Sequence, residues 1–179
     1  MSATYIEKVT TLFTADAIEK RIQEIGKIIS LEYGAITPEN PLCLIVVLKG
    51  AFVFAADLIR TITIPCTIDF IRASSYGSEK ISSGTVDITH NLTVTNRHIL
   101  LIEDIVDTGL TIQRITADLM TGNPASLRLC TLLDKPDSRK HAVNINYTGF
   151  IVPDNFIVGY GIDYNERYRE LPSLGILDS

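Results

Sequence analysis

Short apolar runs alternate along this chain with segments whose apolar residues recur at helical spacing. The first helical segment covers residues 14–30, where isoleucines fall three or four positions apart, at Ile18, Ile22, Ile25 and Ile29. This spacing places them on one face of a helix, and Thr14 or Asp16 can cap its start. The continuous apolar run from Leu42 to Leu48 is typical of a strand buried on both faces of a sheet.

The same alternation continues to the end of the chain. Two more helices are expected, at residues 51–59 and 111–120. Further strands are expected at 67–72, 99–102, 127–133, 150–152 and 156–160. The alternating runs 86–88 and 92–94 predict a hairpin, and the polar segment at about 74–85 predicts a loop long enough to be a lid. Strands alternating with helices indicate an α/β fold with a mostly parallel central sheet.

Composition limits the class of protein further. The chain has 179 residues, 46% of them hydrophobic, which suits a single domain over residues 1–179 with a sizeable core. The net charge of −5 argues against a nucleic-acid partner, because phosphate contacts need clustered Lys and Arg.

The charged residues that interrupt the apolar segments, and the cysteine spacing, bear on the cellular location of the protein. The most apolar stretch, residues 41–59, is broken by Lys49, Gly50 and Asp57, so we expect no membrane span and no signal peptide. Three widely spaced cysteines predict neither a disulfide framework nor a zinc site. We therefore expect a cytoplasmic protein.

The strongest chemical signal is a group of three acids, Glu103, Asp104 and Asp107, that follows the buried run 99–102. Clustered carboxylates repel one another and resist loss of water, so they need a counter-ligand: a metal ion, hydroxyl donors, or both.

Residues 107–111, Asp-Thr-Gly-Leu-Thr, lead from these acids into the predicted helix. Backbone N–H groups at such a turn, together with the helix dipole, form a site for a phosphate, and Thr108 and Thr111 add hydroxyl donors. Acids beside a phosphate site suit a ribose 5′-phosphate. The alternative is a plain strand-to-helix turn with Asp107 as a cap.

At this point the chain resembles a known family. Residues 102–111, Ile-Glu-Asp-Ile-Val-Asp-Thr-Gly-Leu-Thr, are similar to the phosphoribosyl pyrophosphate (PRPP) motif of type I phosphoribosyltransferases. Residues 48–50, 74–77, 133–136 and 156–169 occur in the order found in the bacterial branch that acts on 6-oxopurines. The resemblance covers about residues 10–177. It implies a sheet flanked by helices, a small hood and a flexible lid loop.

The resemblance also implies residue roles on the sugar-phosphate side. Glu103 and Asp104 would hold the ribose hydroxyls and, with Asp163, place Mg²⁺. Asp107 would be the general base near purine N7 or a positioning group, and the peptide between Leu48 and Lys49 can be cis in the family. The residues expected to contact PRPP or pyrophosphate are Lys49, Gly50, Ser75, Tyr76, Glu103, Asp104, Asp107, Thr108, Gly109, Leu110, Thr111 and Arg169. Leu110 stands where some relatives carry Lys, which matters little if only its backbone N–H binds.

On the purine side the resemblance implies four residues: Lys135, Phe156, Ile157 and Asp163. The Lys135 ammonium has only donors, so it can pair with a 6-oxo group and not with a 6-amino group. Phe156 would stack on the base. By pattern alone, Lys135 could be an ordinary surface lysine and Phe156 a core residue.

The implied activity is purine salvage: PRPP and hypoxanthine or guanine give IMP or GMP and pyrophosphate, with a homodimer or homotetramer as the assembly. Two alternatives stay open. One is a regulator of the same fold that senses PRPP and binds nucleic acid. The other is a transferase for another base, of which xanthine is the strongest competitor because it also offers a 6-oxo group.

Overall fold

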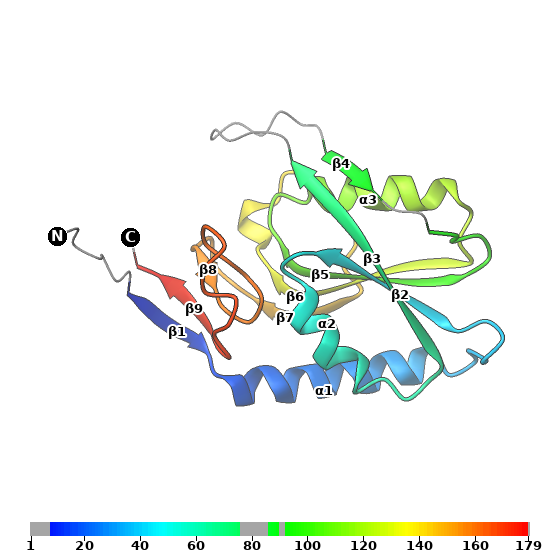
Figure 1. Ribbon diagram of the computed structural model, residues 1–179, viewed down its shortest axis with the longest axis horizontal. Coiled ribbons are helices and arrows are strands. Elements are labelled where there is room, and N and C mark those ends of the chain that lie inside the picture. The colour runs from blue at the N-terminus through cyan, green and yellow to red at the C-terminus, as the bar shows by residue number, and fades with distance from the viewer. Residues whose placement is uncertain (1–7, 76–85, 90–91, 179) are drawn as a thin grey trace.

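The computed structural model describes residues 8–75, 86–89 and 92–178. A six-stranded sheet lies at the centre, in the order β4-β3-β2-β5-β6-β7, and all its strands but β4 run parallel (Figure 1). Its strands are β2 (Leu42–Leu48), β3 (Cys66–Ser75), β4 (Val86–Thr89), β5 (His98–Val106), β6 (Ser126–Asp134) and β7 (Tyr147–Ile151). This confirms the predicted α/β fold.

Helices cover both faces of the sheet. Helices α1 (Ala15–Glu32) and α2 (Phe52–Ile59) pack on one face against Leu42, Leu44 and Val46 of β2. Helix α3 (Leu110–Thr121) packs on the other face, against the alternate residues of the same strand. The prediction that β2 is buried on both faces is thus confirmed.

Helix α1 forms where the isoleucine spacing predicts it. Ile18, Ile22, Ile25 and Ile29 are each at most 1% exposed. Thr14 is the N-cap: its Oγ1 accepts a hydrogen bond of 3.3 Å from the backbone N–H of Ala17.

A second, smaller sheet joins the two ends of the chain. It has the order β1-β9-β8, with β1 at Val9–Phe13, β8 at Ile157–Val158 and β9 at Leu174–Leu177 (Figure 1). The Phe13 ring stacks on Phe150 of β7 at 4.0 Å, which fastens this sheet to the central one. The hydrophobic pattern did not predict β1 or β9, and it assigned residues 156–160 to one longer strand. The resemblance did imply a small hood.

Several predicted elements differ from those in the structure. Strand β5 continues past Ile102 to Val106, because its backbone still pairs with β6 at Glu103, Ile105 and Val106. The predicted hairpin is wrong: β4 pairs with β3, and residues 92–94 form no strand. Ser74 and Ser75 belong to β3, so the expected lid cannot begin at 74; Tyr76 and the rest of it, through residue 85, lie outside the described residues.

Two compositional expectations can be compared with the structure. Cys43, Cys66 and Cys130 are all free thiols. In the part of the chain described here, no helix is both long and apolar enough to cross a bilayer.

Candidate active site

The candidate residues gather where β2, β5 and β6 end, at one edge of the parallel sheet, the edge at which such folds bind ligands. Gly50, just after β2, lies directly against Asp104 of β5. A Cβ placed on Gly50 would come 1.6 Å from Oδ2 of Asp104, so any larger residue would displace that carboxylate. The peptide between Leu48 and Lys49 is cis.

Glu103 and Asp104 are neighbours on β5 and differ in environment. Glu103 is 8% exposed, and its Oε2 has no hydrogen-bond partner among the described residues. Asp104 is half-buried, and its Oδ1 accepts from the backbone N–H of Ile105 at 2.9 Å. Burial, followed by the neighbouring Asp104 carboxylate, holds the pKa of Glu103 well above its usual range. A buried carboxyl oxygen with an open coordination position suits a hard cation such as Mg²⁺.

Residues 107–111 form the predicted phosphate loop between β5 and α3. Gly109 precedes α3 with φ of 86°, in the left-handed region that favours glycine, and a Cβ there would lie 2.6 Å from the carbonyl oxygen of His141. The Thr108 Oγ1 accepts from the N–H of Leu110 at 3.5 Å. A hollow of about 130 Å³ lies against the loop, and both acids of β5 line it together with Asp107, Thr108 and Thr111.

Lys135 lies just beyond the end of β6. It is 7% exposed, and its backbone N–H donates to the carbonyl of Val106 at 3.0 Å, which places it beside the phosphate loop. Its Nζ lies 3.7 Å from Oδ1 of Asp154. The reading of Lys135 as an ordinary surface lysine is therefore wrong. The pattern did not single out Asp154, whose only signal is its place two residues before Phe156.

Phe156 and Ile157 have different surroundings. Phe156 is 52% exposed and meets Tyr164 edge to face at 5.2 Å, so it is no core residue and is open to a stacking partner. The Ile157 side chain is buried in the core cluster, which leaves only its backbone for a ligand.

Asp163 and Arg169 bind each other. The Arg169 Nη2 lies 2.8 Å from Oδ1 of Asp163, and its Nη1 donates to the carbonyl of Gly161 at 2.7 Å. Among the described residues, no three potential ligands are close enough to form a metal cluster, so the structure does not unite Asp163 with Glu103 and Asp104. The metal role of Asp163 stays a prediction.

Glu166 was missed by the sequence analysis. Its carboxylate lies 2.9 Å from Nζ of Lys49 and 3.4 Å from Nη2 of Arg169. The hydrogen bond from Lys49 is the main reason why the pKa of Glu166 is lowered. Both cations predicted to meet pyrophosphate therefore have a protein carboxylate as counter-ion.

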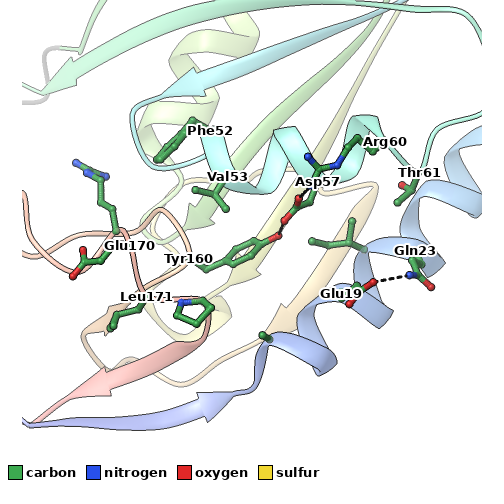
Figure 2. Close-up of a pocket in the computed structure, with 14 residues that line it drawn as sticks. Glu19, Gln23, Phe52, Val53, Asp57, Arg60, Thr61, Tyr160, Glu170 and Leu171 are labelled. Atoms are coloured by element: carbon green, nitrogen blue, oxygen red, sulfur yellow. Dashed lines mark hydrogen bonds and ion pairs between the residues drawn. The ribbon is translucent and has the colours of Figure 1, made fainter.

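A cavity larger than the hollow beside the phosphate loop lies elsewhere in the described part of the chain. It has a volume of about 850 Å³ and is bounded by α1, α2 and residues 169–172 (Figure 2). Figure 2 shows Tyr160 reaching across it to Asp57, to which its hydroxyl donates a hydrogen bond. None of the three acids lines this cavity, so its size does not mark the candidate site.

Comparisons with known proteins agree with this geometry. Residues 9–165 match the family model of the phosphoribosyl transferase domain. The chain is 47% identical over 173 residues to the hypoxanthine-guanine phosphoribosyltransferase of Mycobacterium avium, which covers 94% of this chain and 85% of that protein. It is 44% identical over 174 residues to the hypoxanthine-guanine phosphoribosyltransferase of Bacillus subtilis, covering 96% of this chain and 93% of the relative. A solved structure of Trypanosoma cruzi hypoxanthine phosphoribosyl transferase matches with a TM-score of 0.90 and 38% identity, covering 99% of this chain and 95% of that one.

The buried charge of Glu103 makes a prediction about stability. In the presence of a chelator at neutral pH, Glu103→Gln should raise the free energy of unfolding by about 1–3 kcal/mol, because it removes a buried carboxylate that lacks partners. The folded-state pKa is raised, so the wild type loses stability as the pH rises from about 4.3 towards that pKa, and the difference between the two proteins should vanish below pH 4.

Urea unfolding at several pH values measures this difference. Glu24→Gln, on the exposed side of α1, is the matched control and should leave the pH dependence unchanged. A Glu103→Gln protein less stable than the wild type at neutral pH would contradict the prediction.

Proposed function

The chain belongs to the phosphoribosyl transferase family, and on that premise we propose that it transfers the 5-phosphoribosyl group of PRPP to hypoxanthine and guanine in purine salvage. The products are IMP or GMP and pyrophosphate. The observation that carries this proposal is the meeting, at one sheet edge, of a buried acid pair, a phosphate loop and the nearly buried Lys135 ammonium. The relatives from M. avium and B. subtilis, named for this activity, support it.

In the reaction, purine N9 forms a bond to C1′ of the ribose while the bond from C1′ to the pyrophosphate oxygen breaks. Positive charge grows on the sugar ring as the leaving group departs. Glu103 and Asp104 accept hydrogen bonds from the ribose hydroxyls, and their negative charge stabilises this transition state. The loop 107–111 binds the 5′-phosphate through its backbone N–H groups, including that of Leu110, and through Thr108 and Thr111.

Mg²⁺ fits the acid pair, because Glu103 has an unpartnered buried oxygen and Asp104 lies next to it. When bound, the ion neutralises part of the pyrophosphate charge and orients that group. We propose that Asp163 also helps to place the metal ion.

Pyrophosphate leaves on the other side of the sugar. We assign its contacts to Lys49, Gly50 and Arg169, with Ser75 at the end of β3 and Tyr76, the next residue in the sequence. The Arg169 guanidinium can give two parallel hydrogen bonds to phosphate oxygens. Since Glu166 is the counter-ion of Lys49 and Arg169 in this structure, the leaving group has to compete with that carboxylate.

The purine base is recognised beside the end of β6. Lys135 donates to the 6-oxo group, Phe156 stacks on the ring, and the backbone of Ile157 together with Asp163 meets the far edge. Oδ1 of Asp154 lies 3.7 Å from the Lys135 ammonium and is its counter-ion in this structure. Asp107, exposed at the end of β5, takes the proton of purine N7 or orients the base.

The free thiols and the net charge bear on the cellular location and the partners of the protein. We propose that the protein works in the cytoplasm, where PRPP and free bases meet and where three free thiols persist reduced. The net charge of −5 disfavours the alternative of a nucleic-acid-binding regulator, for which a gel-shift assay is the direct check.

We further propose a homodimer or homotetramer. Among the large apolar side chains that remain exposed in the described chain are Phe52 at 46%, Ile68 at 38% and Phe70 at 50%. Pairing with β2 places Ile68 and Phe70 on the sheet face that α2 covers. A second copy of the chain would remove such a surface from water.

The activity itself is tested with radiolabelled bases, PRPP and Mg²⁺. Hypoxanthine and guanine should be converted to their nucleotides, and adenine should not. The rate measured with xanthine decides whether it is a substrate as well. Addition of EDTA should abolish turnover and excess Mg²⁺ should restore it.

Lys135→Ala should reduce the preference for hypoxanthine over adenine by at least about tenfold, since a lost charged hydrogen bond costs about 1.5–3 kcal/mol. Unchanged discrimination would remove Lys135 from base reading.

Asp107 is tested by Asp107→Asn, which keeps its shape and removes its charge. The kcat should fall by about a hundredfold or more, the usual contribution of a positioned acid or base, while the affinity for PRPP changes little. Steady-state kinetics measures both constants. A variant with the kcat of the wild type would show that Asp107 has no part in the chemical step.

Assembly is tested by light scattering. The wild type should have twice or four times the monomer mass, and Phe70→Glu should give a smaller species because a charge cannot be buried between two apolar faces. Met120→Glu, at an equally exposed position on α3, should leave the mass unchanged. A monomeric wild type would refute the proposed assembly.

A further inference from the structure

Three consecutive carbonyl groups at the start of the phosphate loop are bonded to a single neighbouring segment, residues 135–141. Val106 O accepts from the backbone N–H of Lys135 at 3.0 Å, and Thr108 O accepts from the N–H groups of Lys140 and His141 at 3.0 and 2.9 Å. Asp107 O, between them, accepts from the Arg139 side chain. The loop is therefore held along its whole first half by one segment.

This bonding determines where the loop's N–H groups point. In a trans peptide the C=O of one residue and the N–H of the next point in opposite directions. With the carbonyls of residues 106, 107 and 108 turned towards the segment, the N–H groups of Asp107, Thr108 and Gly109 are turned away from it. These are the donors that a phosphate in the adjacent hollow needs.

Arg139 is the only side chain among these donors. Its Nε donates to Asp107 O at 2.8 Å and its Nη2 to Val106 O at 2.9 Å, and its guanidinium also pairs with the carboxylate of Asp134. The side chains of Arg139 and Asp134 are only 18% and 16% exposed. A Cβ on Gly109 would lie 2.9 Å from Cδ of Arg139, so the loop is packed directly on the arginine stem.

Asp134 is the last residue of β6 and precedes Lys135, whose ammonium is assigned to the base. Arg139 thus joins the end of the strand that presents Lys135 to the loop that binds the phosphate. The guanidinium lies behind the loop, bonded to carbonyl oxygens, and is not itself a phosphate ligand.

We infer that Arg139 is a positioning residue: its forked guanidinium holds the peptides after Val106 and Asp107 so that their N–H groups face the 5′-phosphate, and ties this cradle to the base-reading end of β6. The inference rests on the proposed function. A lysine cannot replace this role, because its single ammonium cannot reach both carbonyls and Asp134 in a fixed plane.

The test compares two ligands that differ only in the phosphate. Calorimetry with IMP and with inosine gives the contribution of the 5′-phosphate as the ratio of their affinities. Arg139→Ala should lower this ratio by about tenfold or more, with a matching rise in KM for PRPP and a smaller change in kcat. Arg139→Lys should give an intermediate loss.

Arg128→Ala is the matched control. Arg128 also bonds a carboxylate and one further group, Glu32 and the Tyr147 hydroxyl, but at a distance from the loop along β6. It should reduce thermal stability and leave the IMP-to-inosine ratio unchanged. A merely structural Arg139 would behave in the same way, with lower stability and an unchanged ratio.

The outcomes separate the inference from the function it rests on. If the wild type neither turns over substrate nor binds IMP, the proposed function fails. If the wild type binds IMP and both Arg139 variants keep its ratio, only the role of Arg139 is overturned. Should Arg139→Ala fail to fold, Arg139→Lys keeps the charge and the stem and decides the question alone.

Discussion

The burial of Glu103 beside Asp104, near the carboxyl end of the central strand β5, is the constraint on which the rest of the site depends. Burial there, followed by the neighbouring Asp104 carboxylate, raises the pKa of Glu103. Its Oε2 has no hydrogen-bond partner among the described residues, so a cation or hydroxyl donors suit it. The surrounding chain accommodates this arrangement. Gly50 leaves the space that Asp104 occupies, and residues 107–111 follow within the same run of backbone, so the acids proposed for the sugar and the loop proposed for the phosphate belong to one continuous segment.

A second feature joins what could have been separate subsites. The segment after β6 carries Lys135 and also bonds the carbonyls of the phosphate loop, through backbone N–H groups and through Arg139. Because of these hydrogen bonds, the ammonium proposed to recognise the base and the amides proposed to bind the phosphate are held by one segment. Such pre-organisation lowers the entropy lost when two substrates are brought into reacting geometry.

The leaving-group side is organised differently. Lys49 and Arg169 come from distant parts of the chain and are held by Glu166 and Asp163, in ion pairs with partly exposed side chains. Exposed pairs contribute little stability and exchange readily with solvent. An arrangement of this kind suits a group that has to bind as part of PRPP and leave as product, whereas the half-buried Arg139–Asp134 pair, which also bonds two backbone carbonyls, suits a part of the site that stays fixed.

The sequence by itself determined whatever local periodicity and local chemistry express: the isoleucine face of α1, the two-sided burial of β2, and the acids and phosphate loop within residues 102–111. It also indicated the α/β class, since helices and strands alternate. Only the tertiary structure decided that β5 runs on to Val106, that β1 pairs with β9 at the opposite end of the chain, and that Asp163 faces Arg169 instead of the acid pair. Arg139, Asp154 and Glu166 gave no signal in the pattern, because a charged residue in a polar loop looks like surface until its partners are known. Some of those partners are distant in sequence, as Lys49 is from Glu166, and others are backbone carbonyls, which carry no side-chain identity, so these contacts exist only after the chain has folded.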